Sequence, residues 1–476
     1  MRYFNFNSLA EIEQAAVSVG AAHVGFEHDP EKIKAILARK VRVGGFTLGN
    51  SIAIHPMEGC DGTPDGLPGD LTWRRYRRFA SGGAKLIWFE ATAVRADGRA
   101  NTRQLWLRPD TMPGFAKLLE MMRREHEHCF GTSGDLLEVL QLTHSGRYSV
   151  PRRVVVSHNP VVDRKSGVPP DHPVISDGEL ERIEDDYVEA ARLAADAGFR
   201  AIDIKATHGY LVSELLSARL REGRYGGPLE NRARFLRNVI GKIRSVLGDR
   251  LTLCMRLGCY DGIPYVPGPA GAAGIPLEYS VPYLHGFGVD VNDPLREDLT
   301  EVKQLVAWLA EWGIELLNIS LGSPYTNPHI GRPFEKPDDG NYEPPEHPLR
   351  GVDRHFRIAG ELQRSFPNLP MVGTGYSWLQ RFMIHAAAHN IESGNIRFFG
   401  AGRNALPYPD FALDALSKGE LDDARVCKTV TYCTYLMRRK QHPLGQFPTG
   451  CPPFDKDVFG PIMKEARDAK RRAEAK

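Results

Sequence analysis

The sequence lacks a long apolar run, and it lacks an excess of charge of either sign. No run approaches the roughly 18 residues of a spanning helix, and the opening MRYFNFNSLAEIEQ has no apolar segment typical of a secretion signal. With 61 basic and 59 acidic residues, the net charge is only +2, too little to attract nucleic acid or an anionic membrane. We therefore expect a cytoplasmic protein that acts on small molecules, as a monomer or a homo-oligomer, without nucleic-acid or membrane partners.

Cysteine is also sparse for a chain of 476 residues. No C-x-x-C pair occurs, and the odd number of widely spaced cysteines argues against a disulfide framework. The pattern instead indicates free thiols in a reducing compartment. The seven cysteines are Cys60, Cys129, Cys254, Cys259, Cys427, Cys433 and Cys451.

Short apolar runs alternate with longer amphipathic stretches from about residue 51 onward. One such stretch repeats apolar residues at helical spacing, from Phe235 through Val239 and Ile243 to Val246. This strand–helix alternation predicts an α/β fold, a (β/α)8 TIM barrel, with a doubly wound sheet as the competing architecture. The predicted strands are SIAIHPM, AKLIWFEATAV, LLEVLQL, RAIDIK, LTLCMRL, IELLNIS, PMVGT and IRFFG.

The chain divides into three predicted parts: an N-terminal helical extension (1–43), the barrel (44–410) and a helical C-terminal tail (411–476). A hairpin turning at Gly44-Gly45 is expected to plug the barrel floor. The stretches 258–296 and 322–352 follow the fifth and sixth strands and are longer than ordinary connecting loops. We therefore expect them to be lids over the catalytic face. The basic end of the tail is expected to be a solvated helix.

The strand RAIDIK and the residues after it carry the strongest chemical signal. Because side chains alternate along a strand, Asp203 and Lys205 should face the barrel interior. His208 and Tyr210 follow just beyond the strand end, where barrels hold their active sites. Three side chains that can exchange protons are therefore expected to converge at one mouth.

This segment resembles the old yellow enzyme family. The chain reads D-I-K-A-T-H-G-Y-L and then Y-G-G-P-L-E-N-R-A-R-F, matching the family's motifs, and the similarity extends over about residues 44–410. The resemblance implies an FMN-dependent oxidoreductase. Reduced NADH or NADPH would serve as transient reductant, and hydride would pass through the flavin to an activated alkene or a related electrophile.

The family's site residues carry over position by position. The resemblance implies that Gln141 binds the flavin pyrimidine edge and that Arg256 lies near flavin N1 and O2. It also implies that His208 binds the substrate oxygen and Tyr210 donates a proton, with Lys205 beside them in place of the family's histidine. The residues expected next to the flavin ring are Pro56, Met57, Glu58 and Ala91, where Glu58 replaces the threonine or cysteine that is common in relatives.

A phosphate site can be argued without the family. Barrels commonly bind phosphate with the loops after strands 7 and 8, and these loops carry Gly373, Thr374 and Gly375, and Gly400, Gly402 and Arg403. A dinucleotide fold would need a further βαβ unit, for which only a polar helical tail remains. The two loops therefore predict a monophosphate site, which fits FMN.

Three alternatives stay open at this point. A lysine replaces the family's histidine at position 205, so a flavin-dependent amine or alcohol dehydrogenase of the trimethylamine dehydrogenase type remains. A barrel lyase that forms a Schiff base on Lys205 is the second alternative, and a non-catalytic flavin-binding barrel is the third. No metal is expected, because Cys427, Cys433 and Cys451 do not have the C-x-x-C-x-x-x-C spacing of the cluster-binding relatives.

Overall fold

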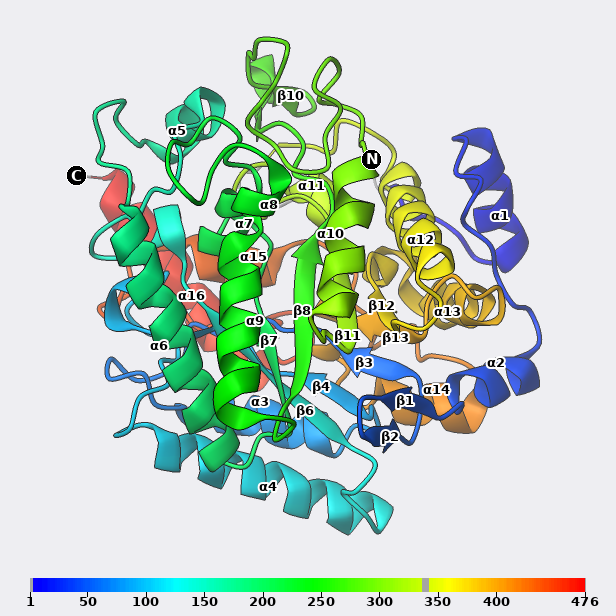
Figure 1. Cartoon of the computed structure of the whole chain (residues 1–476). Helices are drawn as coiled ribbons and strands as arrows, with labels where there is room; N and C mark the ends of the chain where they lie inside the picture. Colours follow the sequence, from blue (N-terminus) through cyan, green and yellow to red (C-terminus); the bar gives the residue numbers. More distant parts are fainter. Residues whose placement is uncertain (1–2, 336–341, 476) are drawn as a thin grey trace.

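Eight parallel strands form a closed barrel in the computed structural model, which describes residues 3–335 and 342–475 (Figure 1). Neighbouring strands pair in chain order, and the ring closes because β13 pairs with β3. All eight predicted runs form these strands, so the (β/α)8 barrel is confirmed and the doubly wound sheet is excluded. The strands are β3 (Ile52–Ile54), β4 (Leu86–Trp88), β6 (Leu137–Thr143), β7 (Ala201–Ile204), β8 (Thr252–Gly258), β11 (Leu316–Ser320), β12 (Met371–Gly373) and β13 (Phe398–Ala401).

Amphipathic helices surround the barrel. In α9 the predicted periodic residues, among them Phe235, Val239 and Ile243, are buried against the strands, whereas Val246 is 57% exposed. Burial of one apolar stripe per helix supplies most of the core. The principal outer helices are α3 (Asp70–Ala80), α4 (Met112–Phe130), α6 (Asp177–Asp196), α9 (Arg234–Leu247), α10 (Thr300–Glu311), α12 (Pro348–Ser365), α13 (Met383–Glu392) and α14 (Phe411–Lys418).

A hairpin closes the amino end of the barrel, as predicted. Its strands β1 (Val41–Val43) and β2 (Phe46–Leu48) pair antiparallel, and Gly44 takes a φ of +53° in the turn. Val43 and Leu48 are buried in one cluster with inward-facing barrel residues. The hairpin thus begins within residues expected in the extension, whose helices are α1 (Leu9–Ser18) and α2 (Pro30–Leu37).

Both predicted lid segments lie at the carboxyl ends of the strands. The first carries the short pair β9 (Tyr265–Val266) and β10 (Ile275–Pro276), visible beyond the tip of β8 in Figure 1. The second carries α11 (Pro328–Gly331); its residues 336–341 lie outside the described part of the chain. No helix in that described part is long and apolar enough to cross a membrane.

The C-terminal tail contains α15 (Tyr432–Arg438) and α16 (Lys456–Glu474), the latter red in Figure 1. The expectation of a solvated final helix is wrong for one face of α16, because its apolar residues recur at helical spacing and are buried. Asp455, just before α16, bonds Arg74 and Arg78 of α3. The tail is therefore tied to the barrel at α3, where Leu71 packs against an apolar cluster that the tail forms within itself, of Tyr435, Leu436, Phe447, Phe459, Met463, Ala466 and Ala469.

Candidate functional site

One cavity of about 240 Å³ lies at the carboxyl ends of the strands. Every predicted site residue except Gly373 lines it. Gly373 is the last residue of β12 and does not line the cavity, whereas the next residue, Thr374, does. A Cβ on Gly373 would come within 2.9 Å of Ile396. The predicted residues on the wall are Pro56, Met57, Glu58, Ala91, Gln141, Lys205, His208, Tyr210, Arg256, Gly375, Gly402 and Arg403.

Asp203 organises the floor of this cavity. Its buried carboxylate accepts hydrogen bonds from Trp88 Nε1 at 2.8 Å, Gln141 Nε2 at 2.6 Å and the backbone N of Arg256 at 2.7 Å. Burial raises the pKa of Asp203, and these three hydrogen bonds oppose the rise. The inward-facing carboxylate of β7 therefore fixes the side chain of Gln141 on β6 and the backbone of β8.

Arg256 and His55 place unused hydrogen-bonding atoms in the same wall. Burial lowers the pKa of Arg256 to about 10, against the attraction of Asp203. Arg256 Nε and His55 Nε2 are buried, and neither has a hydrogen-bond partner within the described structure. His55 was not predicted. Buried polar atoms normally find partners, so these atoms point to a polar ligand.

The predicted phosphate end shows the same feature. Arg403 Nη2 donates to the carbonyl of Pro333 at 2.6 Å, while Arg403 Nη1 is buried without a partner in the part of the chain that is described. Gly402 also lines the cavity, and a Cβ there would come no closer than 3.7 Å to its nearest neighbour, His55. An unpartnered guanidinium nitrogen beside a glycine in the cavity wall fits an anionic phosphate. These residues together fit FMN.

Lys205 lies at the opposite, reacting end. Its Nζ is 3.6 Å from the ring centroid of Tyr210, and no carboxylate lies within 4.0 Å of it among residues 3–335 and 342–475. Burial lowers the pKa of Lys205 to about 7, helped by Arg256 and opposed by Glu58 and Asp203. Lys205 is therefore an amine that loses its proton near neutral pH, because desolvation outweighs the nearby carboxylates.

His208 enters the cavity from a strained backbone. Its φ is +68°, a region in which non-glycine residues are uncommon. Its Nε2 lies 3.4 Å from Ser320 Oγ. Burial, with the charges of Arg256 and Lys205, holds the pKa of His208 well below its usual value. The ring is thus neutral at pH 7 and can donate one hydrogen bond without carrying charge.

Tyr210 forms a pair that sequence reasoning missed. Its hydroxyl lies 3.0 Å from the hydroxyl of Tyr325, and Tyr325 stacks on Tyr148 with centroids 4.0 Å apart. Burial, Tyr325 and Glu58 raise the pKa of Tyr210 well above its usual value. Tyr210 therefore keeps its proton at neutral pH. Tyr325 lies in the loop after β11, where no motif marked it.

Glu58 lies opposite Lys205. Asn101 Nδ2 donates a hydrogen bond to Glu58 Oε1. Burial raises the pKa of Glu58, and Lys205 and Asn101 oppose the rise. The carboxyl and the amine thus moderate each other through the field of a buried pair rather than through a close ion pair.

The C-terminal tail supplies the remaining wall, which the sequence did not indicate. Two bonds fasten the tail there: Thr449 N donates to Gly59 O at 2.7 Å, and Arg332 Nη1 donates to Thr434 Oγ1. The tail has no motif and no apolar strand, so no sequence signal could place it. Its lining residues are Cys433, Thr434, Met437, Arg438, Gln446 and Thr449.

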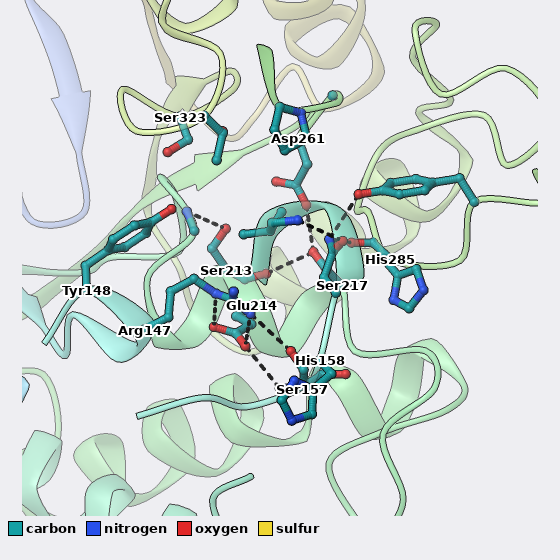
Figure 2. Close-up of a pocket in the computed structure, with 17 residues that line it drawn as sticks. Arg147, Tyr148, Ser157, His158, Ser213, Glu214, Ser217, Asp261, His285 and Ser323 are labelled. Carbon is teal, nitrogen blue, oxygen red and sulfur yellow. Dashed lines mark hydrogen bonds and ion pairs between the residues drawn. The ribbon is translucent and has the colours of Figure 1, made fainter. Parts of the chain in front are cut away.

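A second, smaller cavity of about 70 Å³ lies behind Tyr148 and Gly209. Figure 2 shows Arg147 bonded to Glu214 in its wall; Arg147 also bonds Asp163 at 2.6 Å. Asp261 accepts from Ser217 Oγ at 2.6 Å. Both predicted lids line this cavity, the second through Ser323 and Thr326, and the second lid also lines the large one. No cluster able to hold a metal ion occurs in the described part of the chain.

The fold and the wall of unpartnered donors define a nucleotide-binding barrel, and comparisons place it in a family. The family model described as NADH:flavin oxidoreductase / NADH oxidase matches residues 39–267. An NADPH dehydrogenase of Geobacillus thermodenitrificans is 33% identical over 260 residues, covering 52% of this chain and 69% of that protein. The chain belongs to the NADH:flavin oxidoreductase / NADH oxidase family, as its resemblance to old yellow enzymes predicted.

Solved structures agree on the fold. An old yellow enzyme homologue from Zymomonas mobilis has a TM-score of 0.56 at 20% identity, covering 81% of this chain and 94% of that one. A 2-naphthoyl-CoA reductase has a TM-score of 0.62 at 18% identity, covering 85% of this chain but only 55% of that one. The protein is an FMN-dependent oxidoreductase with a reduced nicotinamide as its reductant, and it acts on small molecules.

Proposed function

We propose that this protein reduces an alkene conjugated to a carbonyl, or a related electrophile. The observation that carries the proposal is the convergence of Lys205, His208 and Tyr210 on the cavity that also holds Gln141, Arg256 and Arg403. Bound FMN supplies two-electron chemistry, because it accepts hydride from a reduced nicotinamide and gives hydride to the acceptor.

Each side chain has a proposed part in holding the cofactor. Arg403, with the backbone at Gly375 and Gly402, would bind the phosphate. Gln141 and Arg256 would bind the pyrimidine edge, where a fixed cation stabilises negative charge. Pro56, Met57 and Ala91 would line the ring.

Three further side chains would act on the acceptor. Neutral His208 and the amine of Lys205 would hydrogen-bond the carbonyl oxygen and polarise it. Tyr210, which keeps its proton because burial raises its pKa, would donate that proton to carbon. The Tyr325 hydroxyl at 3.0 Å orients Tyr210 and can return a proton to it.

An amine dehydrogenase would need Tyr210 or Glu58 as a base. A Schiff-base lyase would use the lowered pKa of Lys205, but it gives no role to the unpartnered atoms of Arg256 and Arg403. Borohydride treatment in the presence of carbonyl compounds distinguishes the lyase from the flavin-dependent reactions, since only the lyase would become covalently trapped on Lys205.

The experiment that tests the proposal is a two-stage measurement on purified holoenzyme. NADPH or NADH should bleach the flavin absorbance without oxygen, and enals or enones should then restore it. If amines reduce the flavin while nicotinamides do not, the dehydrogenase alternative replaces the proposal.

The proposed catalytic unit is the barrel of residues 44–410, which lies in the chain between the extension and the tail. We also propose a cytoplasmic location, which the free thiols at all seven cysteines support.

A further inference from the structure

The wall of the large cavity carries an excess of positive charge. Among the described residues that line it, Glu58 is the sole carboxylate, against five basic side chains. Arg256 and Arg403 have proposed partners on FMN, and Lys205 has one on the acceptor. Two cations are left without a role. The five are Lys205, Arg256, Arg332, Arg403 and Arg438.

Both remaining arginines lie where the tail meets the loop after β11. Arg332 donates to Thr434 Oγ1 of α15. Arg438, at the end of α15, donates through Nη2 to the carbonyl of Pro324. Arg438 is exposed and still lines the cavity, so it marks the mouth. Its carbonyl partner holds the guanidinium in place without neutralising its charge.

A second cation, Lys165, is close enough to Arg438 to feel its charge. Lys165, half-buried in α5 (Pro160–Ser166), has its pKa lowered by burial and by the charge of Arg438. Within the described ranges, neither Lys165 nor Arg438 has a carboxylate closer than 4.0 Å. Nearby Arg147 shows the usual arrangement, because both Glu214 and Asp163 pair with it. Two neighbouring cations without a counter-ion favour an anionic ligand.

We propose that Arg438 and Lys165 form an anion-binding subsite at the mouth of the cavity, which takes a phosphate or carboxylate of a ligand whose reacting part lies at Lys205 and His208. The inference rests on the proposed function for the identity of that ligand. The anion can come from the nicotinamide dinucleotide, through its 2′-phosphate, or from an acidic acceptor. Both sources share one chemistry, and the experiment distinguishes them.

The test compares three variants of the holoenzyme: Arg438→Gln, Lys165→Gln and the control Lys440→Gln, which removes an exposed charge two residues further along the chain. One arm measures the KM for NADPH and for NADH in flavin reduction. The other measures reoxidation by cinnamaldehyde and by 4-carboxycinnamaldehyde, which differ in one carboxylate. Titration with adenosine 2′,5′-bisphosphate against adenosine 5′-monophosphate adds a binding readout that needs no turnover.

If the anion comes from the nicotinamide dinucleotide, Arg438→Gln raises the KM for NADPH about tenfold and weakens the binding of adenosine 2′,5′-bisphosphate by a similar factor. The KM for NADH is then unchanged. In the acceptor case, only the carboxylated aldehyde is affected. Tenfold corresponds to loss of about 1.4 kcal/mol. If all four substrates and the bisphosphate stay within about twofold of wild type, as with Lys440→Gln, the subsite does not exist. If no nicotinamide reduces the flavin, the proposed function fails instead, and the subsite is then decided by the bisphosphate titration together with binding of the two aldehydes to the holoenzyme.

Discussion

The two cavities at the carboxyl end of the barrel are lined by neighbouring residues, Gly209 in the smaller and His208 and Tyr210 in the larger, but use their polar groups differently. In the smaller one, the charged groups satisfy one another: Arg147 bonds Glu214 and Asp163, and Asp261 bonds Ser217. In the larger one, buried nitrogens of Arg256 and Arg403 have no partner within the described structure. A satisfied cavity maintains the fold, whereas an unsatisfied one is shaped for a ligand. Substitutions in the two should therefore have opposite signatures.

The largest expected effect lies in the smaller cavity. Arg147→Gln leaves Glu214 and Asp163 buried without their cation, and breaking such a network costs about 3–5 kcal/mol of stability. Urea unfolding of the holoenzyme should detect it, while the FMN content of the folded fraction stays at the wild-type level. Arg182→Gln, on the exposed face of α6, is the control and should barely change the unfolding midpoint. Selective loss of FMN without destabilisation would reverse the comparison.

The next effect concerns proton donation in the larger cavity. Tyr210→Phe removes the donor, so flavin reoxidation by an enone should slow by about 10² or more, while reduction by nicotinamide and the unfolding free energy change little. Rapid-mixing absorbance measures both halves. Tyr325→Phe keeps the donor but removes its partner, and it should slow reoxidation less. Equal slowing of both half-reactions by Tyr210→Phe would assign Tyr210 to flavin placement.

A third substitution tests the unpartnered guanidinium directly. Arg403→Ala should weaken FMN binding by about 1.5–3 kcal/mol, the range for a hydrogen bond to a charged group. Flavin fluorescence during titration of the apoprotein gives the Kd. Arg397→Ala, whose guanidinium bonds Pro367 O on the exterior, is the matched control. An unchanged Kd in Arg403→Ala would place the phosphate elsewhere.

The smallest effect depends on pH. Lys205→Met should weaken the binding of dinitrophenolate by about tenfold, or about 1.4 kcal/mol. This ligand stays ionised from pH 6 to 8. Because the pKa of Lys205 is about 7, wild-type affinity should be high at pH 6, where the amine is protonated, and should fall by pH 8 toward that of the variant. Flavin absorbance titrations measure this.

Glu58→Gln removes the negative charge that raises the pKa of Lys205, so it should move the fall in affinity to lower pH. The same affinity in wild type and Lys205→Met across this range would show that Lys205 does not touch the ligand.

The parts of the fold that the sequence predicts are those that depend only on residues close together in the chain. The run RAIDIK became β7, with Ile202 and Ile204 outside the barrel and Asp203 inside, because strand alternation depends only on neighbouring residues. The glycine turn at Gly44 predicted the floor hairpin for the same reason. Element positions and inward-facing residues could thus be read directly.

What sequence could not predict depends on distant contacts. The charge of Lys205 is set by burial and by Glu58, which lies 147 positions earlier in the chain, and no local pattern encodes that field. Arg438 lines the cavity because bonds between distant parts of the chain, such as Thr449 N to Gly59 O, hold the tail against the barrel. Tyr325 meets Tyr210 because the loops after β11 and β7 start from strands that both pair with β8.

The left-handed backbone at His208, with a φ of +68°, limits redesign of this enzyme. Among residues with side chains, asparagine, aspartate and histidine tolerate that conformation best. The backbone conformation alone therefore restricts which donor side chains can replace His208. Serine, threonine or tyrosine would have to remodel the loop first, so directed evolution here should return asparagine more often than any hydroxyl side chain.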